Sequence, residues 1–141
     1  MKNKTDADWI PHRDDTFISQ IGDVQERRRE SMIEIGLQTT ERQKNLSGIV
    51  HGGVIMALFD RTIGINCRDS RPETRMATAT ITVNMLRQVH VGDFLIFRCR
   101  LRKKGRKAYF ADAEALVGDR LVGTACGVWM TIENVGTNAL S

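Results

Sequence analysis

The chain has 141 residues, of which 41% are hydrophobic, 27% charged and 6% aromatic, and its formal net charge is +4. This length fits one domain with a real hydrophobic core, and the apolar fraction excludes a disordered chain. The longest apolar stretch is Val54 to Phe59, far short of the ~20 residues that a membrane-spanning helix needs. The N-terminus lacks the apolar stretch of a signal peptide, so we expect a cytoplasmic protein that does not associate with a membrane.

The three cysteines, Cys67, Cys99 and Cys126, are widely spaced and form no C-x-x-C pair. The three histidines stand alone, so the sequence holds no pattern of zinc ligands. We therefore expect reduced, mostly buried thiols, no metal and no redox cofactor.

The first half of the chain predicts two short elements and one long helix. Residues 1–16 are polar and are expected to form a flexible lead-in. A strand is expected from Phe17 to about Arg29, another over residues 32–37, and a turn at 45–48. A helix should begin at Gly52 and Gly53 and run to about residue 67. Residues 54–59 are apolar on every side, which indicates a helix enclosed by the rest of the protein.

The second half reads as strands. Between residues 77 and 85, apolar side chains alternate with threonine and asparagine, which predicts a strand. Further strands are expected over 94–102, 109–117 and 121–132, joined by short turns as an antiparallel meander. The result is an α+β domain over 17–133, with its sheet curled around the helix, followed by a tail at 134–141.

The positive charge is concentrated between Arg98 and Lys107. Such a patch suits a nucleic acid, a membrane surface or a phosphorylated small molecule. Aromatic residues are scarce there, and Tyr109 and Phe110 do not make a stacking platform, so we do not expect a nucleic acid as partner. For the alternating Arg98, Arg100 and Arg102, a solvated or subunit-facing sheet surface is the simpler interpretation.

Two features near the helix suggest chemistry. The glycine pair at the helix start presents unpaired backbone N–H groups, which would polarise a carbonyl and stabilise an oxyanion; a plain tight turn is the alternative. Asp60 lies about two turns into the helix, where a carboxylate is costly to bury and suits a general base. An ion pair with Arg61, Arg68 or another basic residue, or simple exposure at the edge of the helix, would also explain this residue.

The spacing of these features predicts a dimer. Gly53 and Asp60 are seven residues apart, which places ~10.5 Å of helix between them. A water molecule held by Asp60 cannot comfortably reach a carbonyl bound at Gly53 of the same chain. If both groups serve one reaction, two chains must pair with antiparallel helices and share two composite sites.

The motif resembles that of a known family. His51, Gly52 and Gly53 followed by Asp60 are similar to the signature of hotdog-fold acyl-CoA thioesterases of the phenylacetate-degradation (PaaI-like) type. The resemblance covers about residues 30–132. It extends to four further features: Asn45 before His51, the hydroxyl of Thr78, and the turns Val91-Gly92-Asp93 and Lys104-Gly105-Arg106. It implies a hotdog fold, with five or six antiparallel strands wrapped around one helix, in homodimers or dimers of dimers.

The resemblance also implies roles for individual residues. The N–H of Gly53, helped by Gly52, would polarise the thioester carbonyl, and Asp60 of the partner subunit would act as general base or nucleophile. Thr78 would help position the water, and Asn45 and His51 would orient the thioester and the loop. The turn that contains Gly105 would bind the phosphates of coenzyme A through Lys103, Lys104 and Arg106. Coenzyme A would enter only as part of the substrate.

Two departures and two alternatives accompany this interpretation. Arg61 follows Asp60 where relatives carry a small or neutral residue, and Gln88 replaces a proline that is common in the family. A hotdog protein that binds acyl-CoA without hydrolysing it is the main alternative, although a mere binder needs neither Asp60 nor Thr78. A hotdog dehydratase is disfavoured, because His51 belongs to the H-G-G motif instead.

Overall fold

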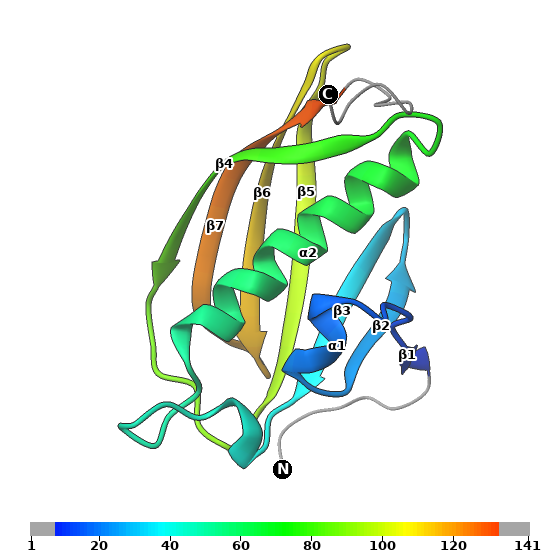
Figure 1. Ribbon diagram of the computed structural model, residues 1–141. Helices are drawn as coiled ribbons and strands as arrows, with labels where there is room; N and C mark the ends of the chain where they lie inside the picture. The colour runs from blue at the N-terminus through cyan, green and yellow to red at the C-terminus, as the bar shows by residue number, and fades with distance from the viewer. Residues whose placement is uncertain (1–7, 133–141) are drawn as a thin grey trace, which may run out of the picture.

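The computed structural model describes residues 8–132 and forms one curved sheet around one long helix (Figure 1). The elements are β1 (Ile10–Pro11), α1 (Phe17–Ile21), β2 (Val24–Arg29), β3 (Met32–Gln38), a 3₁₀ turn (Glu41–Gln43), α2 (Gly52–Ser70), β4 (Met76–Met85), β5 (Phe94–Lys104), β6 (Ala108–Val117) and β7 (Arg120–Thr131). Within the described residues the strands make a seven-stranded antiparallel sheet of order β1-β2-β3-β5-β6-β7-β4. The predicted α+β class is confirmed, and the two-residue β1 takes the strand count beyond the five or six expected.

The helix α2 packs on the concave face of the sheet through residues spaced three or four apart. Its buried apolar side chains are Ile55, Leu58, Phe59, Ile63 and Cys67. The Phe59 ring meets Phe97 of β5 edge to face at 5.1 Å. The buried Asn66 side chain accepts a hydrogen bond from Ile33 N and donates one to Ile33 O, which ties the helix to β3.

The expectation that α2 is enclosed on all sides is wrong for the single chain. Met56, within the apolar run, is 48% exposed and lies on the side away from the sheet. One sheet covers one face of a helix, so the other face of α2 stays open until something else packs on it.

The predicted meander of four consecutive strands is also wrong, because its first strand lies elsewhere in the sheet. β4 pairs with β7 at the edge of the sheet, whereas β5 lies between β3 and β6. The β4–β5 connection is not a hairpin turn, because it runs along one end of the sheet. On the way, Leu86 N and Arg87 N donate to Val122 O, and Val89 O accepts from Val50 N. The buried Val89 side chain fixes this path in the core.

The first expected strand is in fact a helix followed by a strand. Ile18 and Ile21 are buried and lie at helical spacing, whereas Phe17 is 67% exposed, and the strand β2 begins only at Val24. The alternative period of three was present in the sequence, but four apolar residues are too few to distinguish it from a strand.

Residues 8–16 differ from the expected loose lead-in, and we call them the N-terminal strap. The β1 strand pairs with β2, and the buried Trp9 packs edge to face on Phe94 on the sheet face opposite α2. Gly36 makes this packing possible, since a Cβ there would lie 2.7 Å from the Trp9 ring. Residues 1–7 and the expected tail at 134–141 lie outside the described residues.

Candidate functional site

Asp60 and Thr78 meet at the centre of the site. The Thr78 hydroxyl donates to Asp60 Oδ1 at 2.5 Å, joining the partly buried side of α2 to β4. The register of β4 against β7 shifts between Thr78 and Thr80, and this irregularity places Thr78 on the helix-facing side with Trp129. The geometry leaves Asp60 Oδ2 without a protein partner among residues 8–132.

A cavity of about 420 Å³ opens beside this pair, between the second half of α2 and the start of β4. Such a volume is typical of small-molecule sites. Its walls are Asp60, Arg61, Gly64, Arg68, Pro72, Thr74, Arg75, Met76, Ala77, Thr78, Trp129 and Ile132. Apart from Asp60, the charged side chains in this wall are arginines.

The start of α2 lies elsewhere. His51 is the N-cap residue, and its Nδ1 accepts from Gly53 N at 2.8 Å. A Cβ on Gly53 would lie 3.0 Å from that ring nitrogen, which explains why a glycine stands here. The N–H that was expected to polarise a carbonyl is therefore paired with His51 in the free chain.

Asn45 serves its own turn. Its side-chain oxygen accepts from Ser47 N at 2.9 Å and Ile49 N at 3.3 Å, and Gly48 completes the turn at a φ of 82°. Asn45 and Gly52 line a second cavity of about 260 Å³ that does not include Asp60. A single chain thus separates the predicted catalytic residues into two groups, one at the start of α2 and one at Asp60.

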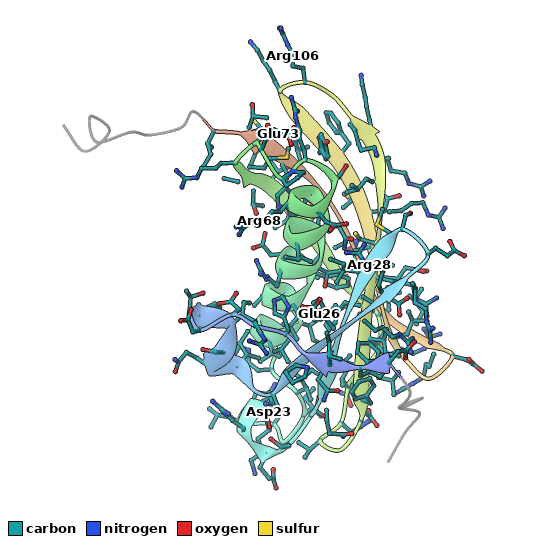
Figure 2. All side chains as sticks on the ribbon, turned by 90° about the vertical axis from the view of Figure 1, so that its right-hand side faces the viewer. Asp23, Glu26, Arg28, Arg68, Glu73 and Arg106 are labelled. Atoms are coloured by element: carbon teal, nitrogen blue, oxygen red, sulfur yellow. The ribbon has the colours of Figure 1, made fainter. Side chains whose placement is uncertain are left out.

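The predicted phosphate-binding turn lies at the other end of α2 (Figure 2). The side chains of Lys103, Lys104 and Arg106 are exposed, and Arg106 extends from the tip of the hairpin. Arg71 Nη1 donates to Gly105 O at 3.2 Å and to Arg106 O at 2.8 Å, which holds the turn against the helix end. Gly105 is required because a Cβ there would lie 2.8 Å from Ala108 O.

Arg61 points neither to Asp60 nor to open solvent. Its Nε donates to His12 Nε2 at 2.9 Å and lies 3.6 Å from Asp14 Oδ2, both in the N-terminal strap. The His12 side chain is only 2% exposed and its Nδ1 donates to Glu26 Oε1 at 2.8 Å. Hydrogen bonds from Thr16 hold the pKa of Asp14 below its ordinary value, with a smaller contribution from Arg61. Sequence reasoning missed this network because no local pattern joins residue 12 to residue 61.

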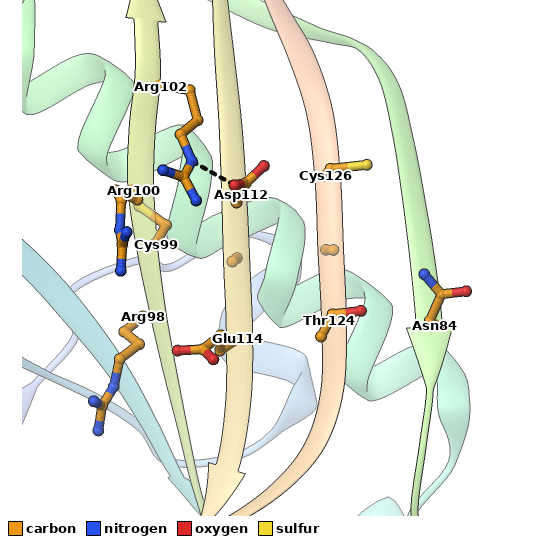
Figure 3. A pocket seen from close by; sticks show the side chains of 11 residues that line it. Asn84, Arg98, Cys99, Arg100, Arg102, Asp112, Glu114, Thr124 and Cys126 are labelled. Atoms are coloured by element: carbon orange, nitrogen blue, oxygen red, sulfur yellow. Dashed lines mark hydrogen bonds and ion pairs between the residues drawn. The ribbon is translucent and has the colours of Figure 1, made fainter.

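The arginine row on β5 lies on the sheet face opposite α2 (Figure 3). Arg98, Arg100 and Arg102 line a cavity of about 390 Å³ together with Asp112 and Glu114 of β6 and Cys126 of β7. Arg102 Nε lies 2.5 Å from Asp112 Oδ2, and Arg98 Nε lies 3.5 Å from Glu34 Oε2. Because acidic side chains alternate with the arginines, this face is not a uniformly basic patch.

The three cysteines are free, and only Cys126 is exposed. Burial raises the pKa of the Cys67 thiol to about 11 and that of Cys99 to about 12. Among residues 8–132, no group of three or more His, Cys, Asp or Glu side chains could hold a metal ion. No helix in that range is long and apolar enough to cross a bilayer.

Comparisons with known proteins identify the family of the chain. Residues 47–124 match the family model of the thioesterase superfamily. Over 96 aligned residues the chain is 33% identical to "Putative esterase PA0474" of Pseudomonas aeruginosa. The aligned region covers 67% of this chain and 72% of that protein.

Solved structures share the fold. Conserved protein PA5202 from Pseudomonas aeruginosa gives a TM-score of 0.77 with 24% identity, covering 83% of this chain and 94% of that one. The PaaI protein from the phenylacetic acid degradation operon of E. coli gives 0.71 with 20% identity, over 77% and 79% of the two chains. Protein smu.793 from Streptococcus mutans, bound to acetyl CoA, gives 0.67 with 21% identity, over 71% and 80%.

Proposed function

Since this chain belongs to the thioesterase superfamily and has a hotdog fold, we propose that it hydrolyses a small acyl- or aryl-CoA thioester to the free acid and coenzyme A. The observation that carries the proposal is the Asp60–Thr78 pair at the wall of a cavity of ligand size. A carboxylate with one oxygen fixed and the other free is suited to hold and deprotonate a water molecule.

The proposed reaction uses Asp60 as a general base. Thr78 orients the carboxylate through Oδ1, and Oδ2 takes a proton from water as the water oxygen attacks the thioester carbon. The carbonyl oxygen becomes negative and is stabilised by a backbone N–H at a helix start. The C–S bond then breaks, and the proton held by Asp60 passes to the departing thiolate. A nucleophilic role for Asp60 remains the second mechanism within this proposal.

The N–H donor would come from Gly53 of the partner subunit. Gly53 and Asp60 of one chain are separated by ~10.5 Å of helix, and Gly53 does not line the cavity beside Asp60. The exposed Met56 side of α2 favours a second copy of the chain, and so does the outer edge of the ten-residue β4, which has no strand partner among residues 8–132. Antiparallel α2 helices would bring each Asp60 to the partner's helix start, where the substrate carbonyl would replace the His51 ring.

Binding of the coenzyme A phosphates is proposed for the β5–β6 turn. The side chains of Lys103, Lys104 and Arg106 are exposed there, at the end of α2 that the Asp60 cavity approaches. A protein of the same fold, smu.793, was solved bound to acetyl CoA, which supports this class of ligand.

One observation favours the alternative of an acyl-CoA-binding protein without activity. The Gly53 N–H already has an acceptor, His51 Nδ1, at 2.8 Å. If the ring keeps this bond when the ligand binds, the carbonyl has no donor at that position and hydrolysis loses its electrostatic assistance.

The Asp60→Asn substitution tests the proposal against this alternative. The amide keeps the shape and the Thr78 contact but cannot accept a proton, so turnover of acyl-CoA esters should fall at least ~100-fold. Release of free thiol from a panel of short, medium and aryl-CoA esters measures this. The matched control is Asp69→Asn, an exposed carboxylate on the same helix that pairs with Arg28. Equal activity of Asp60→Asn and wild type would remove Asp60 from the mechanism, and a wild type that binds but hydrolyses none of the esters would favour the binding protein.

A further inference from the structure

The Asp60 cavity holds more positive charge than the proposed hydrolysis requires. Arg61, Arg68 and Arg75 line it, whereas Asp60 is the only acidic side chain among the described residues of its wall. Arg61 pairs with Asp14 outside this wall, and Arg68 and Arg75 are exposed without an acidic partner among residues 8–132. The wall therefore offers guanidinium groups with which an anionic group of a ligand can pair.

Arg61 is fixed in a way that leaves its donors available. The strap occupies only Nε, through His12 Nε2 at 2.9 Å and Asp14 Oδ2 at 3.6 Å. Within residues 8–132 the two terminal nitrogens of Arg61 have no protein partner. A guanidinium held by its Nε presents the remaining N–H groups in a defined direction, which is the geometry that binds carboxylates and phosphates in pairs.

Arg68 and Arg75 are both exposed, and neither makes an ion pair or hydrogen bond through its side chain with any residue between 8 and 132. Arg68 follows Arg61 by seven residues, so both lie on the same side of α2, two turns apart. Figure 2 shows Arg68 on the side of the helix away from the sheet. These arginines hold no part of the fold together and are free to contact a ligand.

Gly64 makes room between them. It lies on the helix between Arg61 and Arg68, and a Cβ there would lie 3.8 Å from Trp129 Nε1. The missing side chain leaves the floor of the cavity open above the buried indole. A ligand group can therefore lie along α2 from Asp60 to Arg68 without meeting a side chain at position 64.

We propose that Arg61, Arg68 and Arg75 form an anion-binding subsite that holds a negatively charged group of the thioester substrate. This inference rests on the proposed function, because it places the anion on the same substrate that Asp60 hydrolyses. The group is either a carboxylate at the far end of the acyl chain or a phosphate of coenzyme A. Both are planar or tetrahedral oxyanions that a guanidinium recognises by the same paired hydrogen bonds.

The test uses the double variant Arg68→Gln/Arg75→Gln with four substrates. These are the coenzyme A and pantetheine thioesters of a dicarboxylic acid and of the monocarboxylic acid of equal chain length. The matched control is Arg100→Gln, another exposed arginine, on the opposite face of the sheet. The same four ligands are titrated into Asp60→Asn, with and without the arginine changes, so that binding is measured without turnover.

The expected result is a rise of about 10-fold in KM, with kcat little changed, confined to one kind of substrate. A rise in KM for both dicarboxylic esters, but for neither monocarboxylic ester, identifies the carboxylate of the acyl chain as the group that the arginines bind. A rise in KM for both coenzyme A esters, but for neither pantetheine ester, identifies a phosphate of coenzyme A as the bound group. If, for each of the four substrates, the double variant has the same KM as the wild type, the proposed subsite is overturned. If the wild type hydrolyses none of them, the proposed function fails, and the titrations still decide whether the arginines bind the anion.

Discussion

At the scale of single residues, the two oxygens of Asp60 have different surroundings. Oδ1 accepts a hydrogen bond from the Thr78 hydroxyl, whereas Oδ2 has no protein partner among residues 8–132. The resemblance predicted that Thr78 helps to position a water molecule beside Asp60, and it did not predict the direct hydrogen bond between the two side chains. It could not predict that His51 pairs with the Gly53 N–H, since an N-cap contact depends on the side-chain rotamer rather than on the motif.

Thr78→Val should lower kcat about 10- to 100-fold and leave KM nearly unchanged. Valine keeps the branched shape but removes the hydrogen bond that orients the carboxylate, and one such bond to a charged group is worth roughly 1.5–3 kcal/mol. Steady-state kinetics measures the effect, and Thr80→Val on the opposite face of β4 is the control. Equal losses in the two variants would show that strand packing, not the Asp60 contact, matters.

The thiols should differ sharply in reactivity. Burial raises the pKa of Cys67 to about 11 and that of Cys99 to about 12, so both stay protonated at pH 8, and the thiolate is the reactive form. The folded wild type should therefore react rapidly at no more than one thiol, the exposed Cys126, and Cys126→Ser should have none that reacts rapidly. Counting thiols with a colorimetric reagent in native and denatured protein checks this. Two or three rapid thiols in the native protein would contradict the burial described here.

At the scale of elements, the N-terminal strap is the part that sequence reasoning missed. Its polar composition predicted a loose segment, yet Trp9 anchors it to one face of the sheet and His12 to Arg61 of α2. The long helix and the later strands were predictable because each carries many periodic residues. The strap depends on three or four contacts between distant residues, and such contacts leave no periodic signal.

His12→Phe should separate the strap from the site. Phenylalanine fills the space of the buried ring but breaks its bonds to Glu26 and Arg61, which should cost roughly 1–3 kcal/mol of unfolding free energy. On its own, His12→Phe should raise KM several-fold. Added to Arg61→Gln, it should raise KM no further, because His12 and Arg61 act through the same contact. Thermal unfolding and kinetics of the single and double variants measure this, with the exposed His90→Phe as control. Additive effects on KM would show that His12 acts independently of Arg61.

At the scale of the whole molecule, one chain keeps Gly53 and Asp60 apart, which is why we propose that two chains share each site. The position of β4 at the sheet edge, beside β7, was missed, because a reading in chain order pairs each strand with the next. Within the part of the chain that the structure describes, that placement leaves the ten-residue β4 with an unpaired edge next to the exposed Met56 side of α2. The separation of Gly53 from Asp60 was predictable from helix rise alone.

Complementation between subunits tests the proposed pairing. Asp60→Asn and Gly53→Pro each remove one half of the proposed site, and proline near the start of a helix is tolerated while it removes the N–H. Mixing the two inactive variants should restore part of the activity, since hybrid dimers contain one intact composite site. Mass spectrometry of the mixture monitors subunit exchange. Proven exchange without recovered activity would indicate that each chain carries a complete site of its own.

The contact of Trp9 with Gly36 has an evolutionary consequence. The indole occupies the volume that any larger residue at 36 would need, so the two positions are expected to change together along the lineage. A Cβ at 36 would lie 2.7 Å from both the Trp9 ring and the Phe94 ring, so descendants that keep the tryptophan are held to glycine, and those that lose it can enlarge residue 36 only if Phe94 shifts or is replaced. This pair could therefore serve as a genomic marker of which thioesterase sequences inherited the N-terminal strap and which never had one.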